Sequence, residues 1–347
     1  MIKAGITNVK KILATALIVA FATVMTGCGT NFGTTEDGKQ KYRWKFTVTA
    51  GANSTWYTAA QLFGEELDKQ SNGRMKLQIF TGERLSAGEP VAGVEQLMDG
   101  AKDFSYNSPI IYAGINPRFG AVVMPFRFTS VEEGHEALQG SGGEAYRKLL
   151  AENGVELLGF GESGMRQVTN SKRPIKTPAD MKGLKLRIPG FGLYTDFYRT
   201  VGANPTTMPF SEVFTSIQQG AIDGQENPVD VIYSADLQAV QPYLSIWNYS
   251  YDPLILGMNK DLYESLSDED KQIVRNAAQK ANTFQINENR KQESIKLQEM
   301  EESGIQAYEM SDDEVEQFRA TLAPLYDKYR SIYGDELSKE FIPGGEK

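Results

Sequence analysis

The chain has 347 residues, a formal net charge of −9, one histidine and one cysteine. An acidic chain without a basic stripe is a poor partner for nucleic acid or for an anionic lipid surface. The single cysteine excludes an intrachain disulfide, and His135 alone leaves too few ligands for a His/Cys zinc site.

The first 27 residues have the pattern of a signal peptide. Lys3, Lys10 and Lys11 form a basic start, and residues 12–24 are an apolar run shorter than the roughly 20 residues that span a bilayer. Removing these three lysines changes the net charge from −9 to −12. Cys28 follows Met-Thr-Gly, which resembles the lipobox of bacterial lipoproteins, so we predict a lipid anchor on Cys28. The alternative is an ordinary secretory signal with an incidental cysteine. Residues 28–41, rich in Gly and Thr, are predicted to be a tether.

Strand and helix patterns alternate in the first half of the mature chain. Alternating or continuous apolar runs predict strands at residues 44–49, 75–80, 103–106 and 155–160. Helical spacing predicts helices after Ser54, over residues 91–98, and after Ser130, where Glu133 completes a capping box.

The alternation restarts after residue 166. Thr177-Pro178 begins a helix, residues 184–188 form a strand, and residues 193–201 and 211–219 form helices. Ser267 caps a long helix towards Glu302, and Ser311 caps another ending near Tyr333. The chain is long enough for two domains. We therefore predict an α/β fold with two lobes of mixed, mostly parallel sheets flanked by helices, and a helical C-terminal third.

Few residues could support catalysis. A Ser-His-Asp triad would have to use His135, and no spacing singles out a pair of carboxylates. Residues 159–164 have G-x-G-x-x-G spacing, but the following residues look extended, whereas a dinucleotide site needs a helix to begin there. We expect these glycines to permit a crossing between lobes. No catalytic residue, metal site or cofactor is predicted.

Four residues are candidates for binding an anion. Arg187 ends a predicted strand, where α/β proteins bind ligands, and its planar fork matches a carboxylate. From position alone, a surface arginine or a structural ion pair explains Arg187 equally well. Arg166 lies beside the expected crossing between lobes. Phe210 precedes a helix and could belong to the core or to a pocket wall, and Asn227 follows a turn and could cap a helix or donate to a ligand.

Several ordered segments resemble the solute-binding subunit of tripartite ATP-independent periplasmic (TRAP) transporters, the DctP family. They are MPFRF (124–128), RQVTNSKRP (166–174), TPADMKGLKLRIP (177–189), GANP (202–205), MPFSEVF (208–214) and QQGAIDGQENP (218–228). The resemblance implies two lobes crossed by a long helix, which close on a ligand. The closed form then docks on small and large membrane subunits driven by an ion gradient, usually sodium.

The resemblance also assigns roles within the cleft. It implies that Arg187 is the main carboxylate ligand and Arg166 a second one, with Phe210 a pocket aromatic and Asn227 an amide donor. The implied lobes are residues 42–163 with 253–292, and residues 164–252 with 293–347.

Departures from the family pattern bear on the ligand. Thr49 and Tyr249 occupy positions where sialic-acid-binding members have Asn and His, and Gly190 replaces an Asn, so sialic acid is disfavoured. Asn107 lies near a position where other members place a polar contact. Five aromatic residues expected around the cleft favour a sugar acid or an aromatic acid over a bare dicarboxylate: Trp56, Phe210, Trp247, Tyr249 and Tyr251.

The sequence therefore predicts a non-enzymatic, extracytoplasmic protein that delivers an organic acid, such as a sugar acid, to a TRAP transporter. The alternatives are the binding protein of an ATP-driven importer, a module that senses the acid for a membrane receptor, and an extracytoplasmic enzyme.

Overall fold

A computed structural model describes residues 31–344, which fall into two compact units that divide between Tyr42 and Arg43. The predicted signal peptide and Cys28 lie outside the described residues. In the first unit, β1 (Asn31–Thr34) pairs antiparallel with the start of β2 (Gln40–Val48). The turn between them is closed by the Thr35 N–H, which donates to the Lys39 carbonyl at 2.8 Å. The described part of the predicted tether is therefore a hairpin, because the Gly- and Thr-rich residues form a turn.

The second unit begins with a sheet in the order β2-β4-β10-β5, with β3 beside β2. We call this the first sheet. Phe46 of β2 lies opposite Phe104 of β4 in a parallel pair, and both rings pack on Phe63 in a core without solvent exposure. The further strands of this sheet are β3 (Met75–Thr81), β4 (Phe104–Asn107), β5 (Val155–Asn170) and β10 (Tyr251–Asn259).

The second sheet continues from β5 in the order β5-β8-β6-β7, and β9 pairs with both β5 and β11. The pairs β6-β8, β6-β7 and β9-β11 are parallel. The long strands β5 and β10 pair antiparallel with each other and with neighbours in both sheets, so the pairing is mixed and not mostly parallel. The strands not yet located are β6 (Lys185–Ile188), β7 (Asn204–Thr207), β8 (Gly224–Pro228), β9 (Tyr243–Ile246) and β11 (Gln306–Glu309).

Strand β5 joins the two sheets. Its residues up to Met165 pair with β10, and those from Arg166 pair with β8. Gly159 and Gly164 have φ values of 133° and 110°, which non-glycine residues rarely adopt. No helix begins after the G-x-G-x-x-G segment, so its glycines let an extended strand cross between sheets, as the sequence predicted.

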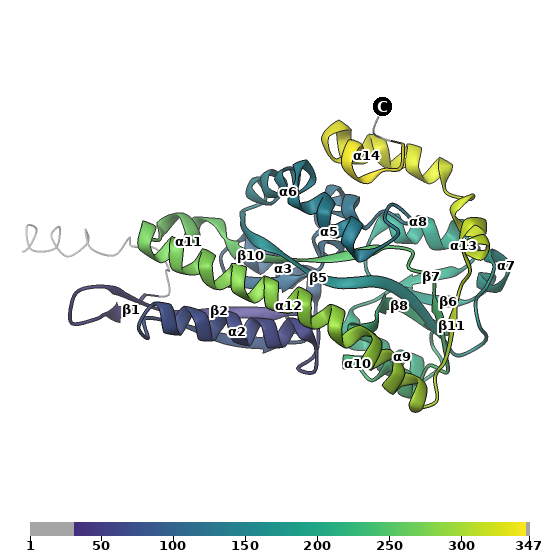
Figure 1. The fold of residues 1–347 in the computed structure, drawn as a ribbon, viewed down its shortest axis with the longest axis horizontal. Helices are drawn as coiled ribbons and strands as arrows, with labels where there is room; N and C mark the ends of the chain where they lie inside the picture. Colours follow the sequence, from purple (N-terminus) through teal and green to yellow (C-terminus); the bar gives the residue numbers. More distant parts are fainter. Residues whose placement is uncertain (1–30, 345–347) are drawn as a thin grey trace, which may run out of the picture. The chain divides into compact units, whose positions relative to one another are not determined.

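Helices cover both sheets (Figure 1). Those of the first half are α2 (Thr55–Gln70), α3 (Pro90–Met98), α4 (Pro109–Tyr112), α5 (Val131–Gln139) and α6 (Ser141–Glu152). Those of the second half are α7 (Pro178–Met181), α8 (Gly192–Thr200), α9 (Val213–Gln218), α10 (Val229–Ser234), α11 (Lys260–Ser265), α12 (Asp268–Glu302), α13 (Asp312–Arg319) and α14 (Ala323–Phe341). Within residues 31–344, no helix is both long and apolar enough to cross a membrane.

The long helix α12 lies against both halves of the second unit. Its 35 residues extend about 50 Å, and it contacts α2, β5 and α10 in turn (Figure 1). The Ser267 hydroxyl caps its start, as predicted. Gln285 fixes it to the crossing strand, because its amide accepts from the Glu162 N–H and donates to the Glu162 carbonyl, both at 2.7 Å.

The C-terminal end differs from the prediction in one respect. The expected single helix from Ser311 to Tyr333 is two helices, α13 and α14, separated by residues 320–322. The Ser311 capping box is present, and α14 continues past a kink at Gly334, whose φ is 76°, as far as Phe341. Helical spacing continues across such breaks, so periodicity alone does not reveal them.

Candidate ligand-binding site

A cavity of about 280 Å³ lies between segments of the first and second sheets. The first-sheet side supplies residues that follow β2 and β4 and the starts of α2 and α3, and the second-sheet side supplies residues at the ends of β6 and β8. The lining residues are Thr49, Ala50, Trp56, Glu89, Pro90, Val91, Ser108, Ile110, Ile111, Arg166, Arg187, Pro189, Gly190, Thr207, Met208, Pro209, Phe210, Asn227, Val231 and Asp252.

Parallel pairing explains why these residues meet. β2 and β4 run parallel, so Thr49 and Ser108, each directly after its strand, reach the same edge. β6 and β8 also run parallel, and Arg187 and Asn227 each precede the last residue of their strand. The cavity therefore lies where carboxyl ends of parallel strands from both sheets converge.

Arg187 is a buried cation without an anionic partner. Its Nε and Nη2 donate to the Met208 carbonyl at 3.1 and 2.8 Å, and its guanidinium carbon lies 5.6 Å from the centre of the Phe210 ring. Only 4% of the residue is exposed, and it forms no ion pair among the described residues. Burial lowers the pKa of Arg187 to about 10, an effect that Glu226 opposes and Arg166 reinforces. An anion held beside this guanidinium would offset its desolvation.

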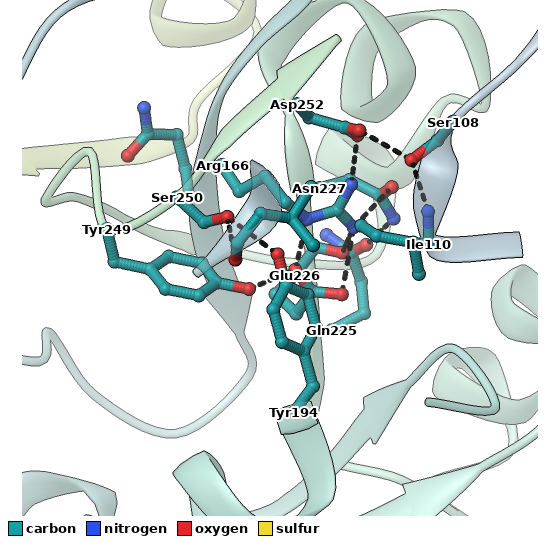
Figure 2. A network of polar contacts seen from close by, with 12 residues as sticks. Ser108, Ile110, Arg166, Tyr194, Gln225, Glu226, Asn227, Tyr249, Ser250 and Asp252 are labelled. Atoms are coloured by element: carbon teal, nitrogen blue, oxygen red, sulfur yellow. Dashed lines mark hydrogen bonds and ion pairs between the residues drawn. The ribbon is translucent and has the colours of Figure 1, made fainter. Parts of the chain in front are cut away.

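Arg166, in contrast, is surrounded by carboxylates (Figure 2). Its Nε and Nη2 donate to the Glu226 carboxylate at 2.5 and 2.9 Å, and its Nη1 donates to Asp252 Oδ2 at 2.5 Å. Burial opposes the charge of Arg166, but Glu226 and Asp252 outweigh it and raise the pKa of Arg166 above its usual range. Two carboxylates thus neutralise Arg166, and only one of its Nη1 hydrogens has no protein acceptor.

Neighbouring groups hold this cluster in place (Figure 2). The Tyr249 hydroxyl donates to Glu226 Oε2 at 2.5 Å, and the Ser108 hydroxyl donates to Asp252 Oδ1 at 2.5 Å. Asn227 Oδ1 accepts from Arg166 Nη2 at 3.1 Å. Burial raises the pKa of Asp252 to about 6, although Arg166 and the Ser108 hydroxyl both favour its ionised form.

Five of the seven residues predicted to contact ligand line the cavity, namely Thr49, Arg166, Arg187, Phe210 and Asn227. Two do not. Asn107 is fully buried behind Thr49, where its Oδ1 accepts from the Thr49 hydroxyl at 2.9 Å and its Nδ2 donates to Glu83 at 2.7 Å. Tyr249 is fully buried beyond Glu226.

The expected ring of aromatic residues is smaller than predicted. Trp56 and Phe210 line the cavity, but Trp247, Tyr249 and Tyr251 belong to the hydrophobic core. The centres of the Trp247 and Tyr249 rings lie 4.7 Å apart, and both rings pack on Phe197 of α8. Aromatic residues near a strand end fill a core as readily as a pocket, so residue type could not separate the two.

Two buried carboxylates at the site were not predicted. Glu226 follows Gln225 in β8, and Asp252 lies in the apolar strand β10. A charged residue inside an apolar strand is the signal that could have pointed to Asp252, because an unpaired buried carboxylate is costly. Among residues 31–344, no group of His, Cys, Asp and Glu side chains is arranged to hold a metal ion.

An unpaired cation enclosed between two sheets that share strand β5 suits reversible capture of an anion, and the fold and cavity together define a solute-binding protein. The chain belongs to the bacterial extracellular solute-binding proteins of family 7, DctP, which match residues 46–332. The family and fold class indicated by the sequence are therefore confirmed.

Similar proteins agree with this assignment. The 2,3-diketo-L-gulonate-binding periplasmic protein YiaO of Escherichia coli K12 is 31% identical over 83% of this chain and 86% of its own length. The sugar-acid-binding protein DctPAm of Advenella mimigardefordensis, solved with galactonate, superposes with a TM-score of 0.84 at 28% identity, covering 88% of this chain and 98% of that chain. A TRAP periplasmic solute-binding protein of Ralstonia eutropha H16, solved with (S)-2-acetolactate, superposes with a TM-score of 0.83 at 31% identity, covering 86% of this chain and 96% of that chain. All three relatives are binding proteins for small acids, and the R. eutropha protein is a periplasmic solute-binding protein of the TRAP class.

Proposed function

We propose that this protein captures an organic acid by its carboxylate at Arg187 and delivers it to the small and large membrane subunits of a TRAP transporter. The observation that carries the proposal is the buried guanidinium of Arg187, which has hydrogens left for a ligand and no carboxylate of its own. Its remaining Nη2 hydrogen and both Nη1 hydrogens form the fork that binds a carboxylate.

The other predicted contacts have supporting roles in this proposal. Asn227 has one amide hydrogen left for a ligand, since the other donates to Gln225 Oε1 at 2.5 Å. Phe210 packs beside the guanidinium and Thr49 lines the opposite wall. Arg166 acts mainly by holding Asn227, Glu226 and Asp252. Tyr249 and Asn107 do not contact the ligand in this proposal; Tyr249 holds Glu226 by a hydrogen bond, and Asn107 holds Thr49. The predicted lobe boundaries belong to the same proposal, and the exchange of β5 partners after Met165 supports them.

Anchoring is also part of the proposal. The sequence around Cys28 favours a lipidated N-terminus that tethers the protein outside the cytoplasm. The sugar acids and other carboxylates bound by related proteins make an organic acid the class of ligand to test first.

The test is a thermal-shift screen of organic acids on the mature protein, followed by calorimetry on the acids that raise the melting temperature. We expect one or more carboxylates to bind with a stoichiometry of one, and uncharged analogues of the same acids not to bind. Binding by the uncharged amide as tightly as by the acid would refute the role of the carboxylate. Turnover of a bound acid would favour the enzyme alternative.

A further inference from the structure

We propose that the ligand of this cavity is a small monocarboxylate with an apolar, branched aliphatic body, and not a sugar acid or a dicarboxylate. This inference rests on the proposed function and narrows it to a class of acid. It follows from three properties of the cavity: its charges, its hydrogen-bonding groups and its apolar wall.

The cavity has a place for one carboxylate. Arg187 is its only cation without a protein carboxylate among the described residues, since Arg166 is paired with Glu226 and Asp252. Asp252 lines the interior, and the exposed Glu89 lines the cavity as well. A second carboxylate on the ligand would therefore meet negative charge, which disfavours dicarboxylates.

The polar side chains inside the cavity are largely committed to the protein. The Ser108 hydroxyl donates to Asp252 and accepts from the Ile110 N–H at 3.2 Å. The Thr49 hydroxyl donates to Asn107. The Asn227 side chain accepts a hydrogen bond from Arg166 and donates one of its two amide hydrogens to Gln225. Thr207, which makes no side-chain hydrogen bond within the described chain, is exposed.

The hydroxyls of a sugar acid would find too few partners here. Each hydroxyl gives up hydrogen bonds to water on entering the cavity, and a buried hydroxyl without a new partner is unfavourable. The side-chain hydrogens left for a ligand are one of the Asn227 amide, one of Arg166 Nη1 and three of Arg187, which suffice for a carboxylate and about two further oxygens. They do not suffice for four or five hydroxyls.

Apolar side chains form most of the remaining wall. Ile110 of α4 and Val231 of α10 line the cavity and are 3% and 4% exposed. The other apolar members of the wall are Ala50, Trp56, Pro90, Val91, Ile111, Pro189, Met208, Pro209 and Phe210. Such a wall favours methyl and methylene groups, whose removal from water is favourable. At about 280 Å³, the cavity is also at the small end for ligand pockets, roughly 300–1,000 Å³.

Three six-carbon acids separate these classes. Gluconate has hydroxyls, adipate has a second carboxylate, and 4-methylpentanoate has neither. Calorimetry on the mature protein should show 4-methylpentanoate binding at least about tenfold more tightly than either of the others. Gluconate or adipate binding equally or more tightly would overturn the inference while leaving the proposed function intact. If none of the three binds at millimolar concentration to the folded protein, the inference is overturned, whereas the proposed function is refuted only if no acid in the wider screen binds.

A single substitution tests the wall directly. Val231→Thr keeps the branched shape of the side chain and replaces one methyl group by a hydroxyl. It should therefore weaken the binding of 4-methylpentanoate several-fold and reduce the difference in affinity between 4-methylpentanoate and gluconate. Val315→Thr is the matched control, because Val315 is a partly buried valine of α13 that does not line the cavity, and it should change neither affinity. Equal affinities in wild type and Val231→Thr would show that the wall does not contact the ligand body, which overturns the inference.

Discussion

Replacing Arg187 should weaken the ligand complex while leaving the unliganded protein as stable or more stable. Arg187→Met removes the charge and the fork but keeps a side chain of similar length. Truncating one partner of a buried charge pair costs about 2–5 kcal/mol, equivalent to roughly a thirty- to several-thousand-fold loss of affinity. The low exposure of Arg187 means that solvent does not reduce this effect. Arg187→Lys keeps the charge without the fork, so its affinity should be intermediate.

The effect on stability has the opposite sign. Burial lowers the pKa of Arg187 on folding to about 10, which corresponds to a cost of about 3 kcal/mol for keeping the guanidinium charged. The folded pKa lies below the unfolded one and both lie above 7, so this cost is fully present at neutral pH. Removing the charge relieves it, and Arg187→Met should therefore melt at the same temperature as wild type or a few degrees higher.

Two measurements check this reasoning. Calorimetry with the best acid gives the affinity, and differential scanning fluorimetry without ligand gives the melting temperature. Arg199→Met is the matched control, because Arg199 is an exposed arginine at the end of α8 that does not line the cavity. A fall of several degrees in the melting temperature of Arg187→Met would show that Arg187 is structural. An affinity within about twofold of wild type would remove it from the site.

Four further predictions concern Arg166, Asp252, the lipid anchor and the energy source of uptake. Arg166→Met leaves Glu226 and Asp252 as adjacent unpaired carboxylates, so the free energy of unfolding, measured with urea, should fall by about 3–5 kcal/mol. An unchanged urea midpoint would show that Arg166 does not stabilise the fold by pairing with these carboxylates. Burial raises the pKa of Asp252 to about 6, and a bound carboxylate favours the protonated form of Asp252, so the affinity for the acid should fall between pH 5.5 and pH 7.5. Asp252→Asn should remove this dependence of affinity on pH, and a wild-type affinity that does not change with pH would refute the link between Asp252 and the ligand. Cys28→Ser should release the protein from membrane fractions, whereas a wild-type protein that is already soluble, with unmodified Cys28, would end the lipid-anchor proposal. Uptake reconstituted with the membrane subunits should stop when the sodium gradient is dissipated, and uptake that needs ATP instead would assign the protein to an ATP-driven importer.

Local elements could be predicted because their signals are local. The Ser54, Ser267 and Ser311 hydroxyls each accept from a backbone N–H in the first turn of the following helix, as the sequence indicated. At Ser130 only half of the predicted capping box forms, because the Glu133 carboxylate accepts from the Thr129 N–H at 2.8 Å and not from that of Ser130. A side chain of this length reaches either amide, and tertiary packing decides between them.

Strand pairing could not be predicted because it is not local. β5 and β10 pair over residues separated by about ninety positions, for example Phe160 with Ile255. Periodicity identified only the first part of β5, since the glycines at 159, 161 and 164 interrupt the apolar pattern. Gly159 and Gly164 have positive φ values, and close neighbours exclude a side chain at two of the positions: a Cβ on Gly159 would lie 2.5 Å from Asn282 Nδ2, and one on Gly161 would lie 1.7 Å from the Tyr106 hydroxyl.

The two arginines show where sequence reasoning about the site ends. Both follow the family pattern, and both were expected to bind the carboxylate. Their protein partners differ: Arg166 meets Glu226 and Asp252, which are 60 and 86 residues away in sequence, whereas Arg187 donates to the carbonyl of Met208. A guanidinium enclosed by two carboxylates holds the site together, and one facing a carbonyl retains its charge for a ligand. The difference lies in which strands flank each arginine, so it becomes visible only when β8 and β10 are in place.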